Sequence, residues 1–417
     1  MVRFTDNLII QLTRDCNLHC EYCFQGNKFE WTSKTIDLDT FKKIVDTTIY
    51  YRCVLGRLEN HIDFHFHGGE VTLLGEDLLV QMLEYVLYRK KYFPGIAISI
   101  QSNGLLVSET FYKYLVSKGI TIGISFDGRR STHRMSLEEN DKLFEKIKYL
   151  STTYGKNIGL LSVLTTENMK TWFEDMREIQ PYVYSVGVNP VVTNECQDYL
   201  IPSLEDQYTY WLKPVLESYC TTDPVFERDV SIIIQKVVGD IVFELDKSNL
   251  KTGCFDRLCG HGSNMIAIDP NLNLASCDKF LEEGAFIHKR EYKTLEDRDF
   301  LGLQQIKKVL TFYKDIVEAE DKVGCDFCKA KWMCNGECQS YMISKIGKVH
   351  IPNTVCDVYK RVYDFIKNNW ITIASHNDVK LILPSSRIRT EALAELETCN
   401  KKILYNDKTN TFKVVDR

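Results

Sequence analysis

Residues 8–23 read LIIQLTRDCNLHCEYC, a short apolar run that leads straight into three closely spaced cysteines. The run Leu8–Leu12 has the length and the side chains of a buried strand, so Cys16, Cys20 and Cys23 fall in the loop behind that strand. Three thiolates in one short loop can hold three irons of a cubane cluster and leave the fourth iron open. The alternative at this point is a zinc loop whose fourth ligand comes from elsewhere.

Five more apolar runs follow, and helical patterns separate them. The six runs are Leu8–Leu12, Ile62–Phe66, Ile96–Gln101, Ile120–Phe126, Ile158–Leu164 and Val183–Pro190. Helical spacing recurs at residues 41–49, where Asp39 is the expected N-cap, and at 79–86 and 111–115. Six strand–helix units predict an α/β fold, a partial TIM-like (β/α)6 barrel that is two units short of closure. Its chemistry is expected at the C-terminal ends of the strands.

Composition narrows the class of protein. The chain has 417 residues, 44% of them hydrophobic, and a formal net charge of −5. We expect a packed core, and nothing in this balance indicates nucleic acid as a partner. No apolar stretch approaches the roughly 20 residues of a membrane span, and the N-terminus has no signal-peptide pattern. The sequence therefore predicts a cytoplasmic protein without a membrane partner, whose 15 cysteines are metal ligands or catalytic groups rather than disulfides.

The pattern of apolar residues changes twice after the sixth run. Helical patterns occupy residues 204–219, opened by Ser203, and 230–245, and loop-rich sequence follows from Lys251 to about Cys356. Such sequence cannot bury much core and needs metal cross-links. A helix over Val358–Trp370 precedes a tail whose residues 403–415 are typical of a hairpin. We expect four parts: a barrel at 1–200, a helical linker at 201–250, a cluster-stapled domain at 251–370, and an extension with a helix and a hairpin at 371–417.

The cysteine loop resembles the CxxxCxΦC motif of the radical SAM superfamily, with Tyr22 as the aromatic residue Φ. The resemblance implies a [4Fe–4S] cluster on Cys16, Cys20 and Cys23 whose open iron binds the amine and carboxylate of S-adenosylmethionine (SAM). Tyr22 would lie against the adenine. Electron transfer from the cluster would break the S–C5′ bond and release a 5′-deoxyadenosyl radical.

Loops behind the later strands resemble further SAM-binding motifs of that superfamily. HGGE at residues 67–70 contains Gly68, Gly69 and Glu70 and resembles the GGE motif for the SAM amine. QSNG at residues 101–104 resembles QTNG, with Gln101, Ser102 and Asn103 in its first three places.

The last two strands carry the remaining resemblances. SFDG at residues 125–128, followed by His133 and Arg134, resembles SLDG…HD…R, in which the serine and the arginine help to hold the ribose and carboxylate. Ser125 matches that serine, but Arg134 stands where the motif has an acid. Val188 and Asn189 end the sixth run, where the superfamily places backbone near the adenine.

The second cysteine group has eight members, enough for two four-ligand sites. They are Cys254, Cys259, Cys277, Cys325, Cys328, Cys334, Cys338 and Cys356. Two structural zinc sites are the alternative, but the spacing resembles the SPASM domain of radical SAM maturases, which carries two auxiliary [4Fe–4S] clusters. The resemblance implies one site made of Cys254, Cys259, Cys277 and Cys338, and another made of Cys325, Cys328, Cys334 and Cys356. The family expects a glycine where Leu272 stands, and we expect Asn271 or Asn273 to take the left-handed turn instead.

The reaction is less constrained than the mechanism class. Anaerobic sulfatase maturases carry an aspartate at the place of Asp278 as a base, although a turn residue or a hydrogen-bond acceptor there is the alternative. We expect a maturase that cross-links a ribosomally made peptide through a thioether, ether or C–C bond. A sulfatase maturase that forms formylglycine is the alternative, and an iron–sulfur redox sensor is the non-enzyme alternative.

Three kinds of partner follow from that expectation. The reaction needs a peptide substrate and an electron donor such as flavodoxin or ferredoxin. A separate leader-peptide-binding protein is expected because the first strand begins by residue 8, ahead of which an N-terminal winged-helix domain does not fit. The tail is expected to cap the barrel mouth or to contribute to peptide docking.

Overall fold

The structure is a computed structural model, and it describes most of the chain. The described residues are 7–25, 35–54, 61–191, 198–245, 265–275, 277–278, 306–334, 336, 338, 342, 348–381 and 385–417. Cys254 and Cys259 lie outside the described residues, so their predicted roles stay predictions.

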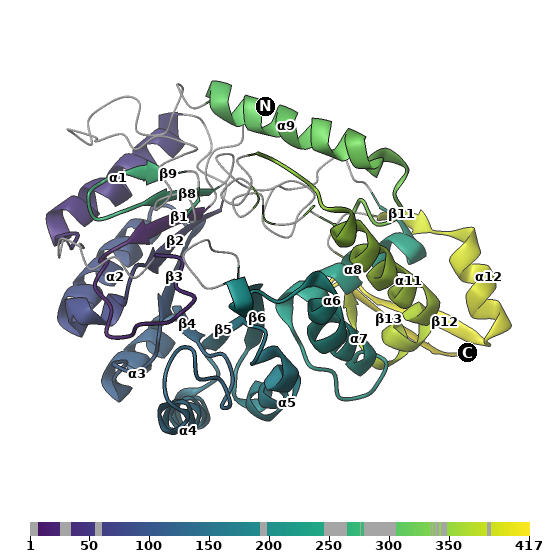
Figure 1. The fold of residues 1–417 in the computed structure, drawn as a ribbon, viewed down its shortest axis with the longest axis horizontal. Helices are drawn as coiled ribbons and strands as arrows, with labels where there is room; N and C mark the ends of the chain where they lie inside the picture. The colour runs from purple at the N-terminus through teal and green to yellow at the C-terminus, as the bar shows by residue number, and fades with distance from the viewer. Residues whose placement is uncertain are drawn as a thin grey trace.

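An eight-stranded sheet in the order β6-β5-β4-β3-β2-β1-β8-β9 organises the larger part of the molecule (Figure 1). Its first six strands are parallel and comprise β1 (Asn7–Gln11), β2 (Ile62–His67), β3 (Ile96–Ser102), β4 (Thr121–Ser125), β5 (Ile158–Leu164) and β6 (Ser185–Pro190). The helices between them are α1 (Leu38–Val54), η1 (Val71–Leu74), α2 (Glu76–Lys90), α3 (Glu109–Lys118), α4 (Leu137–Tyr154), α5 (Met169–Ile179) and η2 (Gln180–Tyr182). The predicted partial (β/α)6 barrel is confirmed. The predicted cap of α1 is wrong, because Asp37 and not Asp39 accepts the Thr40 N–H, at 2.7 Å.

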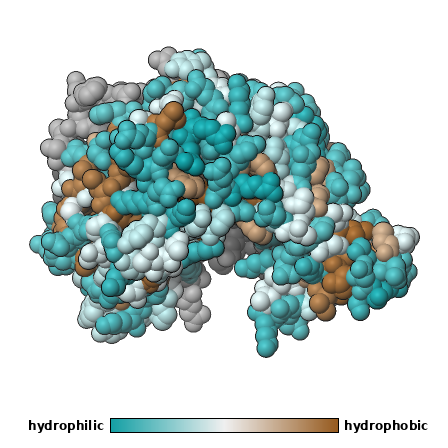
Figure 2. Space-filling view, turned by 90° about the horizontal axis from the view of Figure 1, so that it is seen from below, coloured by the Kyte–Doolittle hydropathy of each residue, from teal (hydrophilic) through white to brown (hydrophobic). Residues whose placement is uncertain are grey.

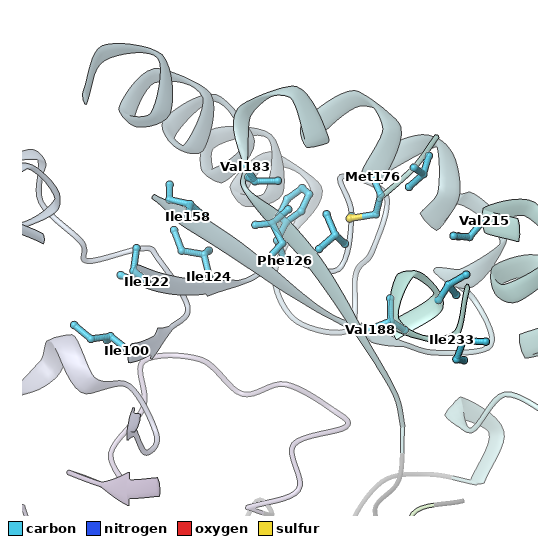
Figure 3. Packing of buried hydrophobic residues seen from close by; sticks show 14 of the residues in the cluster. Ile100, Ile122, Ile124, Phe126, Ile158, Met176, Val183, Val188, Val215 and Ile233 are labelled. Atoms are coloured by element: carbon cyan, nitrogen blue, oxygen red, sulfur yellow. The ribbon is translucent and has the colours of Figure 1, made fainter. Parts of the chain in front are cut away.

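The two faces of the barrel sheet differ in polarity. In β2, Ile62, Phe64 and Phe66 are buried beneath the helices, whereas the residues between them remain partly exposed on the opposite, inner face. Figure 3 shows the same helix-covered layer at β4–β6. The inner face is polar where a closed barrel would be filled with branched apolar side chains. It carries Asp63, His65 and His67 of β2 and Ser99 and Gln101 of β3.

A strand from the second half of the chain extends the barrel sheet. β8 (Met265–Ile268) pairs in parallel with β1, and β9 (Leu274–Ala275) turns back antiparallel to β8. The long helix α9 (Ile306–Val323) places Phe312 and Ile316 against Ile9 of β1 and Ala267 of β8. The expectation that residues 251–356 bury little core is therefore wrong for their described part. The four apolar residues of β8 pair with the free edge of β1, and α9 packs across both strands.

The turn between β8 and β9 corrects another expectation. Leu272 itself adopts the left-handed conformation, with φ 63°, so neither Asn271 nor Asn273 takes that role. The Asp269 carboxylate organises the turn, because its Oδ1 accepts the N–H groups of Asn271 at 2.9 Å and Asn273 at 2.8 Å. These bonds hold both asparagines in place and leave the strained conformation to Leu272.

Helices and a small sheet form the other end of the molecule. After η3 (Asp198–Leu200) come α6 (Leu204–Gln207), η4 (Tyr208–Leu212), α7 (Lys213–Ser218), α8 (Arg228–Val242) and β7 (Phe243–Leu245); η8 (Cys325–Phe327) and α11 (Asn353–His376) follow α9. The tail comprises β10 (Val379–Lys380), β11 (Ser385–Ile388), α12 (Thr390–Thr398), β12 (Lys401–Asn406) and β13 (Thr411–Asp416). The predicted helix at 358–370 is longer at both ends, and the predicted hairpin is confirmed as β12–β13. Of the described helices, none combines the length and apolar character that crossing a membrane requires.

The tail packs on the helical end and not on the barrel strands. β11 pairs with β7, and Phe412 and Val414 of β13 share the main core with α8 and α11. Figure 1 places these elements at the far end of the long axis, and Figure 2 shows hydrophobic side chains gathered at that end as well as over the opposite end. The expected cap over the barrel mouth is therefore wrong, and a role of the tail in peptide docking stays a prediction.

Candidate active site at the C-terminal ends of the strands

The cysteine loop is held in place by the glycines of the neighbouring strand end. Gly69 N–H donates to the Thr13 carbonyl at 2.8 Å, and Glu70 N–H donates to the Asp15 carbonyl at 2.7 Å. A Cβ on Gly68 or on Gly69 would run into the carbonyl oxygens of Thr13 and Asp15. Only glycine permits this approach, so the HGGE loop fixes the segment that leads into Cys16.

The three thiols of the first group lie within electrostatic reach of one another. Burial raises the pKa of Cys20 to about 12, Arg134 opposes that shift, and Cys23 and Cys16 add to it. Burial likewise raises the pKa of Cys16. Thiols crowded together in this way ionise readily only when a metal takes up their charge, so the loop fits an iron–sulfur cluster that three cysteines hold.

The Glu70 carboxylate is engaged by four protein donors. Its Oε1 accepts the Thr72 N–H at 3.0 Å, the Thr72 hydroxyl at 2.6 Å and the Ser102 hydroxyl at 2.7 Å. Its Oε2 accepts the Asn103 N–H at 2.6 Å. Three of these donors share Oε1, so Oε2, with one donor, keeps an acceptor site. In this arrangement Glu70 fastens the HGGE loop to the QSNG loop.

The QSNG loop is tied to the cysteine loop and to β4. The Asn103 side-chain amide donates to Oδ1 of Asn17, next to Cys16, at 2.7 Å. The Gln101 amide donates to the Ser125 hydroxyl at 2.8 Å. The predicted SAM-contacting residues of three strand ends thus form one connected network.

Tyr22, Asp127 and Arg134 form a buried polar group beside the cysteine loop. The Tyr22 hydroxyl donates to Oδ2 of Asp127, and the Val163 N–H donates to Oδ1 at 2.7 Å. Burial raises the pKa of Asp127, and Arg134 opposes that shift. Within the described part of the chain, Nε of Arg134 is buried without a hydrogen-bond partner. That orphaned donor next to Cys20 suits a carboxylate ligand.

Two residues near this group were not predicted as functional. Asp127 stands inside the SFDG motif, which was the only signal for it. His133 contacts Glu21 through Nδ1 at 3.2 Å and Glu167 through Nε2 at 3.0 Å. Because Glu21 lies between two cysteines of the loop, His133 ties that loop to the end of β5.

The end of β6 offers backbone on one side and a polar side chain on the other. The side chain of Val188 is buried on the helix side, next to Ile233 (Figure 3). Only the backbone of Val188 could therefore face a ligand. Asn189 points to the other face and is half-buried.

Four cysteines of the second group gather in the helical part. Burial raises the pKa of Cys334 to about 12, and Cys356, Cys325 and Cys328 around it add to the shift. Burial raises that of Cys325 to about 11, again with Cys356 and Cys328 nearby. Among the described residues, no three ligands converge tightly enough for a single metal ion.

Cys277 and Asp278 lie close to the barrel interior. The Cys277 thiol donates to Oδ1 of Asp278 at 3.0 Å. Burial lowers the pKa of His65 to about 4, His67 lowers it further, and Asp63 and Asp278 oppose the shift. Asp278 therefore stands within electrostatic reach of the inner face of β2. Cys277 and Cys338 are described but Cys254 and Cys259 are not, so the first predicted ligand set stays a prediction.

Comparison with known proteins agrees with this geometry. Residues 10–179 match the model of the radical SAM superfamily. They are a radical SAM domain. The chain is accordingly an enzyme that contains a radical SAM domain, and proteins with this domain use a [4Fe–4S] cluster and SAM.

Similar proteins include maturases. A cysteine-type anaerobic sulfatase-maturating enzyme of Clostridium perfringens is 22% identical over 394 residues, which cover 88% of this chain and 98% of that protein. The structure of native anSMEcpe with bound AdoMet and the Cp18Cys peptide has a TM-score of 0.63 at 19% identity, with 88% and 98% coverage. SuiB of Streptococcus suis, bound to its precursor peptide SuiA, has a TM-score of 0.57 at 16% identity, with 85% and 76% coverage. These likenesses support the radical SAM fold over most of the chain.

Proposed function

We propose that this radical SAM enzyme modifies a ribosomally made peptide oxidatively and forms a thioether, ether or C–C cross-link. The observation that carries the oxidative step of this proposal is the position of Asp278. It joins the second cysteine group, through Cys277, to the polar inner face of β2. After the radical has removed one hydrogen atom, a cross-link requires the substrate to lose one further electron and, for most bonds, a proton, so a carboxylate at this junction is well placed to take that proton. Bound peptides in two similar structures support a peptide as substrate.

The chain's own residues have distinct tasks in this proposal. Cys16, Cys20 and Cys23 hold one cluster, and Arg134 pairs with the carboxylate of SAM. When bound, the cluster and SAM supply a 5′-deoxyadenosyl radical that removes a hydrogen atom from the peptide. The backbone of Gly68 and Gly69 keeps the cysteine loop in place.

The second cysteine group completes the proposed cofactor set. Its eight cysteines hold two further clusters in the two sets given above, and these supply electron uptake. A flavodoxin or ferredoxin delivers the reducing electron from outside, and a separate leader-binding protein presents the peptide.

Formation of formylglycine is the second candidate. It is favoured by the similarity to the sulfatase-maturating enzyme, which extends over 98% of that protein. The two reactions leave different products, because a cross-link removes hydrogen atoms and keeps every sulfur and oxygen atom, whereas formylglycine formation from cysteine removes the sulfur.

The deciding experiment offers the reconstituted enzyme two kinds of peptide. One kind is encoded by short reading frames beside its gene, and the other is a sulfatase segment that contains the target cysteine. Mass spectrometry of the products is expected to show loss of two hydrogen atoms from the first kind only. Conversion of the sulfatase segment alone would contradict the cross-linking proposal.

Asp278→Asn tests the proposed base in the same assay. We expect deuterium from a labelled peptide still to appear in 5′-deoxyadenosine while the cross-linked product is lost. Asp407→Asn, in the exposed turn of the tail hairpin, is the matched control. Product formation at the normal rate by Asp278→Asn would show that another group accepts the proton.

A further inference from the structure

A hydrogen-bonded chain crosses the inner face between β2 and β3 and takes no part in the SAM site. His65 stands opposite Ser99 in the register of the two strands. The Ser99 hydroxyl lies 2.8 Å from Nδ1 of His65 and 3.1 Å from each carboxylate oxygen of Asp63. All three side chains are half-buried on this face.

The order of donors along this chain follows from proton counting. A carboxylate can only accept hydrogen bonds, and the Ser99 hydroxyl, which has one proton to give, donates it to Asp63. The Ser99 oxygen must therefore accept the bond from Nδ1–H of His65. A neutral ring that carries its proton on Nδ1 has a bare, accepting Nε2.

The surroundings of the ring keep it neutral. The groups that face it are Asp63 and His67 from β2, with ring centroids of the two histidines 5.6 Å apart, and Asp278 from the second cysteine group. Burial of the ring lowers its pKa to about 4, so His65 is uncharged near neutral pH. No hydrogen bond to Nε2 is found within the described part of the chain.

We propose that Nε2 of His65 accepts a hydrogen bond from a neutral donor of the peptide substrate and so positions the reacting residue. The proposal rests on the proposed function. His65 is a positioning residue and not the base, because a ring with so low a pKa holds a donor without taking its proton. Asp63 and Asp278 nearby disfavour an acidic side chain at this place, so the chain selects a neutral hydroxyl, thiol or amide N–H.

The first test reads the tautomer directly. Holoenzyme labelled with 15N in its histidines is expected to show His65, assigned by its absence in His65→Gln, with a protonated Nδ1 and a bare Nε2. Ser99→Ala is expected to turn this single tautomer into a mixture. A proton on Nε2 in the wild type would overturn the proposal.

The second test separates binding from chemistry. With the peptide that the enzyme modifies, His65→Phe is expected to raise KM about five- to tenfold, the value of one hydrogen bond. His65→Gln, which keeps an acceptor near the position of Nε2, should recover most of that loss. Thr121→Val, on the same face of β4, is the matched control and should change neither KM nor kcat.

The outcomes distinguish the two proposals. An unchanged KM in His65→Phe, with product still formed, overturns the role of His65 and leaves the proposed function standing. Failure of the wild type to modify any peptide overturns both. A raised KM that His65→Gln restores supports both.

Discussion

At the scale of single residues, a substitution of Glu70 distinguishes a structural role of this residue from a ligand-binding role. Its carboxylate accepts four hydrogen bonds that join the HGGE loop to the QSNG loop. Glu70→Gln turns one acceptor into a donor that faces other donors, and we expect a loss of about 1–3 kcal/mol in the free energy of unfolding. Urea unfolding without SAM measures it, and Glu138→Gln on the exposed surface of α4 is the control. A variant of wild-type stability that binds SAM weakly would show instead that Glu70 is chiefly a ligand.

His65 leads to a prediction about pH. Its pKa in the folded chain is about 4, below the roughly 6.5 of an unfolded histidine, because the ring is buried. Between these values the unfolded chain binds the additional proton, so this residue's contribution to stability is lost as the pH falls from about 6.5 to 4. The wild type should therefore lose stability over this range relative to His65→Gln. Thermal melting of both proteins at a series of pH values measures this. Parallel pH profiles would contradict the low pKa.

Sequence alone predicted the residue types of the site better than their partners. Three cysteines and paired glycines behind strands restrict the chemistry by themselves, and they stand where predicted. The four donors of Glu70 come from two loops about 30 residues apart, and no local pattern specifies them. The chain of His65 and Ser99 had a visible signal, since IDFHFH and IAISIQS alternate where a parallel strand buried on both faces would be apolar throughout.

At the scale of elements, the cysteine loop and the second cysteine group should load iron independently. The triple variant of Cys16, Cys20 and Cys23 to alanine is expected to keep about eight of about twelve irons per chain and to lose SAM cleavage. Iron, sulfide and zinc analysis after anaerobic reconstitution measures this. Cys220→Ala, outside both groups, should keep the full content. Stoichiometric zinc, or 5′-deoxyadenosine released by the triple variant, would contradict the assignment.

The β8–β9 turn offers a second test at this scale. Asp269 accepts two backbone N–H groups and the Asn273 side-chain amide, which donates at 2.8 Å. Asp269→Ala leaves these donors unpaired while Leu272 still has to adopt a left-handed conformation. We expect it to lower the free energy of unfolding by about 2 kcal/mol, and Asp269→Asn, which keeps Oδ1, by less. Denaturant unfolding of the pair measures the difference, and equal stability would contradict the role given to the carboxylate.

The elements of the first half were predictable because each is long and periodic, and β1 to β6 lie within a few residues of their expected bounds. β8 was missed because four apolar residues in glycine- and asparagine-rich sequence give no periodic signal. Its partner, β1, is the first strand of the chain and is far from β8 in sequence. β8 forms a strand because it pairs with the free edge of β1. This is a tertiary interaction, which local sequence does not specify.

At the scale of the whole molecule, the tail is part of the folded core and not an appendage. Phe412 is 1% exposed and packs on Phe243 with ring centroids 5.0 Å apart. Phe412→Ala should cost about 3–5 kcal/mol, whereas Leu404→Ala, 61% exposed on the neighbouring strand, should cost less than about 0.5 kcal/mol. Denaturant unfolding of both variants tests this. If Phe412→Ala cost no more than Leu404→Ala, the tail would not be part of the main core. Its removal could then be used to test peptide docking alone.

The pairing of β1 with β8 has a consequence for biosynthesis. One edge of β1 pairs with β8, which follows it in the chain by roughly 260 residues. The ribosome synthesises β8 only about 10–50 s after β1 at ordinary elongation rates. During that interval the nascent chain displays an unpaired strand edge of the kind that recruits other chains. A chaperone that shields this edge, or slow release from the ribosome, should therefore govern how much of the enzyme reaches its native state in a heterologous host.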